Sequence, residues 1–442
     1  MRGATNDEQG LRDFSITMFG SLLSTIGSQM TQFALVAWVY AKTGSAFDSG
    51  LMATMSYGSV ILFSIFSGAF VDRLNRKKLI MLSDGLMCVA TFTLFLFYGA
   101  HHLSLSILVV YGLVTGLSSS IQFPCYLSII TMMVPEDQRS RANGIYQTAW
   151  SLATTVAPAL AGVLLGIINL KGILIVDLIS YLIIICTVLY ISIPEMERSQ
   201  QPQKSSILKD TVEGFRYLLS RNSLVGFVLI LTSFNIAFGA YEGLFRPMVL
   251  SLTDNNTGIA GFAVMGYGIG NVVSGIFMAI WKGPKNRVPM TLVSWALCGF
   301  SGFVVGGFGR SLPIWMISGF LQGVFNNIAV VLTVGIWQSK VSPAYQGRVF
   351  GIMRLVSQVT IPVSLFLMTL LSDRIVVPLF SHGNGFWLSR YVGHGASAGM
   401  SFVLILSGAL FGVIGPLIMF LFPGIRNADK QSSEMARGSR SI

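Results

Sequence analysis

Five ionisable side chains lie inside long apolar stretches of this sequence, where water is scarce. They are Asp84, Asp177, Glu242, Arg246 and Arg354. A buried carboxyl group can take up a proton on one side and release it on the other, and a neighbouring arginine can pair with it. Which of these roles applies depends on the elements that hold the five residues.

The composition places these residues in a membrane. Hydrophobic residues make up 53% of the 442 residues and charged residues only 11%, which leaves too little polar surface for a soluble globule. Since about 20 apolar residues make one helical crossing, the sequence predicts an all-α membrane protein with twelve transmembrane helices. They span 14–40, 49–71, 79–99, 103–133, 143–168, 172–193, 223–250, 259–281, 289–309, 312–338, 348–371 and 399–423.

Loop charges predict the orientation of these helices. Most of the 29 Lys and Arg residues fall in loops on one side, and positive loops stay in the cytoplasm. Both termini are therefore expected inside, in a multi-pass protein of the cell inner membrane. The positive charge is spread over many loops rather than gathered on one face, which argues against a nucleic-acid partner.

The chain is predicted to consist of two six-helix halves. Sliding the sequence along itself places Arg141 and Gly144 over Arg348 and Gly351, as expected for parallel repeats. The predicted parts are an N-terminal bundle (1–193), an amphipathic cytoplasmic connector (194–222), a C-terminal bundle (223–423) and a cytoplasmic tail (424–442).

The loop after the second helix carries a dense group of charges in the segment GAFVDRLNRKK (68–78). Its spacing resembles the signature of the major facilitator superfamily, which implies that fold. The resemblance further implies that Asp72 meets the start of the eleventh helix and locks a cytoplasmic gate. The predicted gate comprises Gly68, Asp72, Arg73, Arg76, Asp84, Arg141, Arg348 and Arg354. Lys77 and Lys78 are explained more simply, because basic residues hold this loop inside.

The fifth helix carries a row of small residues. Its spacing resembles the exporter signature of drug/proton antiporters, with Gly144, Pro158 and Gly162 at three of the required places and alanines at others. Ordinary helix packing by small residues is the alternative interpretation.

Short matches along the chain also resemble the bacterial macrolide-efflux branch of the superfamily. They are KTGSA (42–46), VDRLNRKK (71–78), MMVPEDQ (132–138), VDLIS (176–180), EGFRYL (213–218) and GRVF (347–350). One feature departs from drug/proton antiporters, because the fourth helix has no arginine and carries Thr115 near that place. Coupling through such an arginine is excluded.

Two acidic sites are therefore candidates for proton coupling. Glu242 and Arg246 are four residues apart on one helical face, so they either neutralise each other or act together in coupling. Asp177 is the second candidate. Asp84 and Arg354 lie nearer the inner helix ends, which favours their place in the gate.

Amide and aromatic residues near the middle of several helices are candidates for binding the solute. They are Gln29, Gln32, Gln122, Asn235, Tyr241, Gln322 and Asn326. Few fixed charges accompany them, which suits a bulky, largely apolar solute such as a macrolide-like drug. Hydrogen bonding between helices is the alternative role for any one amide.

The sequence thus predicts a secondary active exporter that works by alternating access and proton antiport. Its expected partners are a small-molecule substrate, protons and membrane lipids, and we expect a monomer without cofactor or metal. No catalytic motif is recognisable, so an enzyme is not expected. Export of a siderophore or another metabolite, or transport of a lipid, stays open as an alternative.

Overall fold

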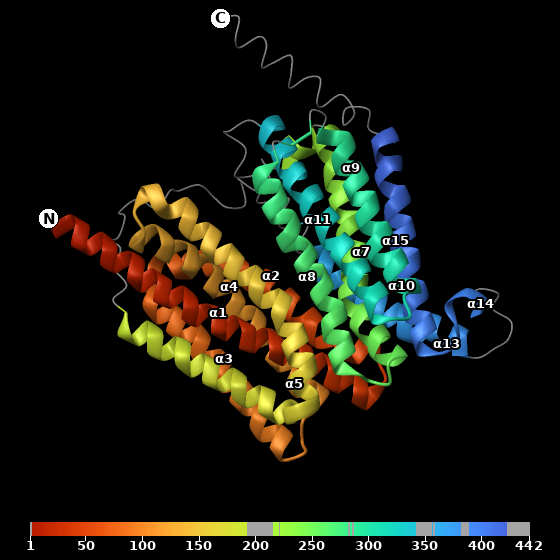
Figure 1. Ribbon diagram of the computed structural model, residues 1–442, viewed down its shortest axis with the longest axis horizontal. Helices are drawn as coiled ribbons and strands as arrows, with labels where there is room; N and C mark the ends of the chain where they lie inside the picture. The colour runs from red at the N-terminus through yellow and green to blue at the C-terminus, as the bar shows by residue number, and fades with distance from the viewer. Residues whose placement is uncertain are drawn as a thin grey trace, which may run out of the picture. The chain divides into compact units, whose positions relative to one another are not determined.

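The computed structural model describes residues 2–191, 215–220, 222–281, 283–284, 287–341, 356, 359–381 and 389–421. All regular elements in these ranges are helices (Figure 1), which confirms the predicted fold class. The chain divides into two compact units. The N-terminal unit comprises Met1–Pro202 with Val249–Met265, and the C-terminal unit comprises Gln203–Met248 with Gly266–Ile442.

Five long helices form the main part of the N-terminal unit. They are α1 (Arg2–Thr43), α2 (Ala46–Arg73), α3 (Arg76–Gly99), α4 (Leu105–Met133) and α5 (Arg139–Tyr190), with a short 3-10 turn at Glu136–Gln138. Helix α1 packs mainly on α5, α2 packs on α4, and α3 lies against both α4 and α5. This arrangement puts faces of α1, α3, α4 and α5 toward one interior.

A kink within α5 confirms the predicted break between the helices 143–168 and 172–193. The helical path continues from Arg139 to Tyr190 and turns sharply at Asn169, where φ is 56°. With ψ at −180°, this conformation lies outside both helical regions, so the helix breaks at this residue. Gly172 makes the tight turn possible, because a Cβ there would lie 2.5 Å from Cβ of Ile168.

The remaining helices lie mainly in the C-terminal unit, whereas Val249–Met265, at the junction of the first two, belongs to the N-terminal unit. They are α7 (Asn222–Leu252), α8 (Thr257–Ile280), α9 (Arg287–Cys298), α10 (Gly306–Phe308), α11 (Leu312–Lys340), α13 (Val377–Ser381), α14 (Ser389–Val392) and α15 (Ala396–Leu421). Residues 359–371 are also helical and continue through a π-helical turn, Ser372–Val376, into α13. The segment 372–398, between the last two predicted helices, is therefore partly helical.

Helix α9 continues into α10 through a π-helical stretch, η2 (Gly299–Val305). A π-helical turn shifts the backbone hydrogen bonds by one residue. Helix α11 contacts this stretch, because the Ser318 hydroxyl donates to the carbonyl oxygen of Ser301 at 2.7 Å.

Nine helical stretches among the described residues are long and apolar enough to cross a membrane. One of them, Glu136–Tyr190, contains the Asn169 turn and therefore covers two of the predicted crossings. The predicted connector falls largely on residues 192–214, outside the described residues. Residues 215–219 at its end are helical, with Leu218 buried and Leu219 exposed.

Candidate functional site

The N-terminal unit contains a partly open polar cavity of about 60 Å³. Helices α1, α3, α4 and α5 supply its walls, which are rich in hydroxyl and amide groups. The lining residues are Ser21, Ser24, Thr25, Ser28, Gln29, Gln32, Asp84, Met87, Thr115, Ser118, Ser119, Gln122, Tyr126, Trp150 and Tyr181. A volume of this size holds a few water molecules, since one occupies about 10–15 Å³ by this measure.

Asp84 is the one charged residue in this lining, and its side chain is 2% exposed. The Gln122 amide donates to its Oδ1 at 2.6 Å, whereas its Oδ2 is buried and has no hydrogen-bond partner among the described residues. A buried charge without a basic partner is costly. The carboxyl group therefore favours a proton or a cationic group at Oδ2.

The cavity brings together residues that the sequence assigned to different roles. Gln29, Gln32 and Gln122 were expected to bind the solute, while Asp84 was expected in the gate. All four line the same space, and Thr115 and Trp150 join them. The sequence did not single out Trp150, because only the fold shows which face of its helix meets the cavity.

Asp177 lies in α5 and is fully buried. Its Oδ2 accepts hydrogen bonds from the hydroxyls of Thr31 at 2.8 Å and Thr91 at 3.3 Å, and Ser180 lies 3.5 Å from its Oδ1. Helix α1 approaches closely here, because a Cβ at Gly27 would lie 2.9 Å from Oδ1 of Asp177. Asp177 thus joins α1, α3 and α5.

A hydroxyl pair lies near both acids. Ser28 of α1 and Tyr181 of α5 lie 2.7 Å apart through their side-chain oxygens, and both also line the polar cavity. Ser28 follows Gly27 and Tyr181 follows Ser180 in the chain. Both hydroxyl groups therefore lie at the cavity wall, next in sequence to residues that contact or closely approach Asp177.

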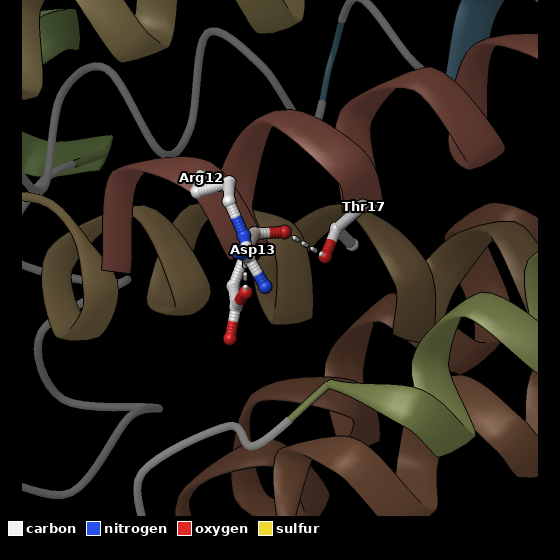
Figure 2. Close-up of polar contacts among 3 residues, drawn as sticks. All are labelled: Arg12, Asp13 and Thr17. Carbon is white, nitrogen blue, oxygen red and sulfur yellow. Dashed lines mark hydrogen bonds and ion pairs between the residues drawn. The ribbon is translucent and has the colours of Figure 1, made fainter. Parts of the chain in front are cut away.

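A further buried acid lies near the start of α1, where the predicted helix had not yet begun. Asp13 is 7% exposed, and its Oδ1 lies 3.9 Å from Nε of the exposed Arg12. The Thr17 hydroxyl donates to the Asp13 carbonyl oxygen at 2.8 Å (Figure 2). The polar sequence before residue 14 concealed this acid, because the helix extends beyond the apolar run.

Only part of the predicted gate lies within the described residues. Arg348 and Arg354 fall outside them, and so do the side chains of Asp72 and Arg73 and the surroundings of Gly68. Arg141 is exposed at the start of α5, and Nε of Arg76 is buried at the start of α3. The contact between Asp72 and the eleventh helix stays a prediction.

The small residues of α5 form a close helix contact inside the N-terminal unit. The Thr257 hydroxyl of α8 donates to the carbonyl oxygen of Gly162 at 2.8 Å. A Cβ added at Gly162 would overlap the Thr257 carbonyl oxygen, and one added at Gly261 would overlap that of Pro158. Gly144 differs, because a Cβ there would meet nothing within 4 Å.

The C-terminal unit contains a row of aromatic rings along α7. Phe234 and Phe238 stack with ring centres 5.8 Å apart, and Tyr241 and Phe245 stack at 4.6 Å. Glu242 and Arg246 form the expected ion pair, with 3.5 Å between Oε2 and Nη2. Their side chains are 18% and 22% exposed, so this pair is less enclosed than Asp84 or Asp177.

The predicted amides of the C-terminal unit contact neighbouring elements. Gln322 is fully buried against η2, where a Cβ at Gly302 would overlap it, and its amide has no partner among the described residues. Asn326 donates to the Tyr267 hydroxyl at 3.1 Å. Asn235 is 4% exposed. Asn326 therefore links two helices, and the solute-binding roles of Gln322, Asn326 and Asn235 stay predictions.

Comparison with known proteins decides the family. The model of the Major Facilitator Superfamily matches residues 17–360. The chain belongs to this superfamily. It is therefore a multi-pass secondary transporter of small molecules and not an enzyme.

Individual relatives are more distant. Macrolide efflux protein A of Streptococcus pyogenes is 23% identical over 362 residues, covering 81% of this chain and 89% of the relative. Multidrug efflux pump Tap of Mycolicibacterium fortuitum is 24% identical over 389 residues, covering 84% and 91%. Enterobactin exporter EntS of Shigella flexneri is 24% identical over 345 residues, covering 77% and 80%.

A solved structure shows the same fold. The nucleoside transporter NupG superposes with a TM-score of 0.70 at 13% identity, covering 93% of this chain and 99% of NupG. At this identity the likeness concerns the fold alone.

Proposed function

We propose that this protein exports bulky, largely apolar small molecules, such as macrolide-like drugs, in exchange for protons. The names of its relatives support export, since macrolide efflux protein A, Tap and EntS are each named for it. Both termini lie in the cytoplasm in this proposal, as the loop charges predict. The direction is then from the cytoplasm across the inner membrane.

The observation that carries the coupling is the unpartnered Oδ2 of Asp84 over the polar cavity. Protonation at Oδ2 removes the charge, while the Gln122 amide keeps its bond to Oδ1 in either state. The carboxyl group can therefore gain and lose a proton without turning. Asp84 replaces Glu242 and Asp177 as the first candidate for the coupling acid.

The cavity is too small for a drug-sized solute, which indicates different sites for the proton and the solute. Pockets for drug-sized ligands have about 300–1,000 Å³, and this cavity has about 60 Å³. A macrolide cannot enter it in the present conformation. We propose that the cavity serves water and protons, and that Gln29, Gln32 and Trp150 meet the solute when the space widens during alternating access.

Two predicted elements complete the proposed cycle. Glu242 and Arg246 hold an ion pair that a solute or proton would have to disturb, so they are the second candidates for coupling. The latch at Asp72 closes the cytoplasmic side, as the family resemblance implies. Its expected partners lie at the start of the eleventh predicted helix (348–371), near Arg348.

The test is accumulation of a labelled macrolide and of a lipophilic dye in cells expressing the chain, with and without a protonophore. We expect expression to lower accumulation and the protonophore to abolish the difference. Asp84→Asn should remove export, while Asp48→Asn, an acid in the first turn of α2 outside the cavity, should keep it. Unchanged export by Asp84→Asn would exclude Asp84 as the coupling acid.

Siderophore export is the second candidate function, because EntS is similar over 77% of this chain. It predicts that the dye and the macrolide accumulate normally. Release of an iron chelator into the medium would instead depend on the chain. Measuring both in the same cells separates the two candidates.

A further inference from the structure

Two adjacent lysines at the start of α3 have different surroundings. The Lys77 ammonium donates to the carbonyl oxygens of Leu189 at 3.0 Å and Ile191 at 2.6 Å. Lys78 is exposed, and its backbone N–H donates to Oδ1 of Asn75. The sequence assigned both lysines the same task of holding the loop inside, and the fold distinguishes them.

The two carbonyl groups that Lys77 reaches lie at the end of a helix. Helix α5 ends at Tyr190, and the backbone of Ile191 is extended. The last carbonyl groups of a helix lack partners within it and carry partial negative charge. An ammonium group there forms strong charge-assisted hydrogen bonds. Lys77 therefore closes the end of α5 from a different helix.

The same lysine lies on the helix that carries Asp84. Lys77 stands in the first turn of α3, and Asp84 follows seven residues later, about two helical turns along. A helix moves largely as a rigid body, so a bond at its first turn restrains the residues further along. Helix α5 in turn holds Asp177 and provides Tyr181 to the cavity wall. Lys77 thus connects two of the four helices whose side chains line the cavity.

We infer that Lys77 is a positioning residue that ties the start of α3 to the end of α5, so that both helices move together when the transporter changes state. The tie has two consequences. It protects the last turn of α5, and it sets the rate of the transport cycle. The second consequence rests on the proposed function, whereas the first does not.

Hydrogen exchange of the purified full-length protein tests the tie directly. Lys77→Met should raise exchange at residues 187–191 by roughly tenfold, because two charge-assisted bonds at a helix end are lost. Lys78→Met removes the same charge from the same loop and should leave this exchange unchanged. Lys77→Arg keeps a donor and should restore most of the protection. Equal exchange in Lys77→Met and Lys78→Met would overturn the tie.

Transport kinetics test the second consequence. Lys77→Met should lower the maximal export rate about three- to tenfold, the range of a modest conformational restraint, with KM unchanged and with normal amounts of protein in the membrane. Lys78→Met should export normally, and Lys77→Arg should recover the rate. Faster exchange with an unchanged export rate would reduce Lys77 to a helix cap and overturn its positioning role. If the unaltered protein exports neither solute, the proposed function fails, and the exchange experiment alone decides the tie.

Discussion

Asp84 and Asp177 are buried carboxyl groups in the same six-helix unit, and they have opposite surroundings. The Asp177 carboxylate accepts hydrogen bonds from α1 and α3 and is fully enclosed. Asp84 has one amide partner, and its second oxygen is unpartnered beside a polar cavity. Hydrogen bonds to a carboxylate stabilise its charged form and hold its neighbours.

This difference distinguishes an acid that links helices from an acid that can exchange a proton. An acid whose oxygens are occupied by donors from several helices acts as a fixed junction between them. An acid with one free oxygen beside water can change its protonation without breaking a helix contact. The two residues are equally buried by exposure, so burial alone does not identify the coupling acid.

The largest effect on stability is expected at Asp177. Asp177→Ala should destabilise the protein by about 2–3 kcal/mol, because the hydroxyls of Thr31 and Thr91 lose their acceptor and a cavity forms. Thermal unfolding of the purified variant measures this, with Asp84→Ala as the matched control. An unfolding temperature lower for Asp84→Ala than for Asp177→Ala would reverse the assignment.

Asp84→Asn should have the largest effect on activity at small structural cost. The amide keeps the volume and can still contact Gln122, but it cannot carry a proton. We expect proton-driven export to fall at least about tenfold, which corresponds to about 1.4 kcal/mol, while the unfolding temperature changes little. Export and unfolding are measured on the same preparation. A variant that exports at the normal rate and loses stability would place Asp84 among the residues that link helices.

Thr31→Val should weaken the junction without removing it. The hydroxyl that donates to Asp177 at 2.8 Å disappears, and the shape of the side chain is kept. The expected loss is about 1 kcal/mol, seen as a smaller drop in unfolding temperature than for Asp177→Ala. Thr31→Ser keeps the donor and serves as the control. A loss as large as that of Asp177→Ala would show that the whole junction depends on this one bond.

Tyr181→Phe tests whether the two regions are separate. It removes the hydroxyl at the cavity wall that pairs with Ser28. We expect less than about 1 kcal/mol in stability and an unchanged pH profile of export. A shifted profile would mean that the hydroxyl pair carries protons between the two acids, and the distinction between them would be lost.

Much of the fold followed from the sequence, because apolar length and loop charge specify membrane helices almost alone. The i, i+4 spacing also sufficed for the ion pair of Glu242 and Arg246. Each of these predictions depends on a single helix, either on its length or on the spacing of two of its residues. The break between residues 168 and 172 was also predicted, and the turn at Asn169 lies within it.

The site was harder to predict because it depends on how helices rotate against one another. Asp84 was assigned to the gate because it lies near the inner end of its predicted helix. Only the packing of α3 on α4 shows that Gln122 lies beside it. Lys77 and Lys78 differ by one residue, about 100° around the helix, and that rotation decides which one reaches α5. The contact of Ser318 with the π-helical stretch Gly299–Val305 likewise comes from helix packing that spacing does not reveal.

The close contact of Gly162 and Gly261 bears on how this protein can change over evolutionary time. Each position faces a carbonyl oxygen of the other helix at a distance that leaves no room for a methyl group. Under selection by a new solute, side chains such as Gln29, Gln32 and Trp150 can vary in size and polarity while the fold persists. Variants with altered solute range are therefore expected to accumulate around the cavity and to be rare at the two glycines.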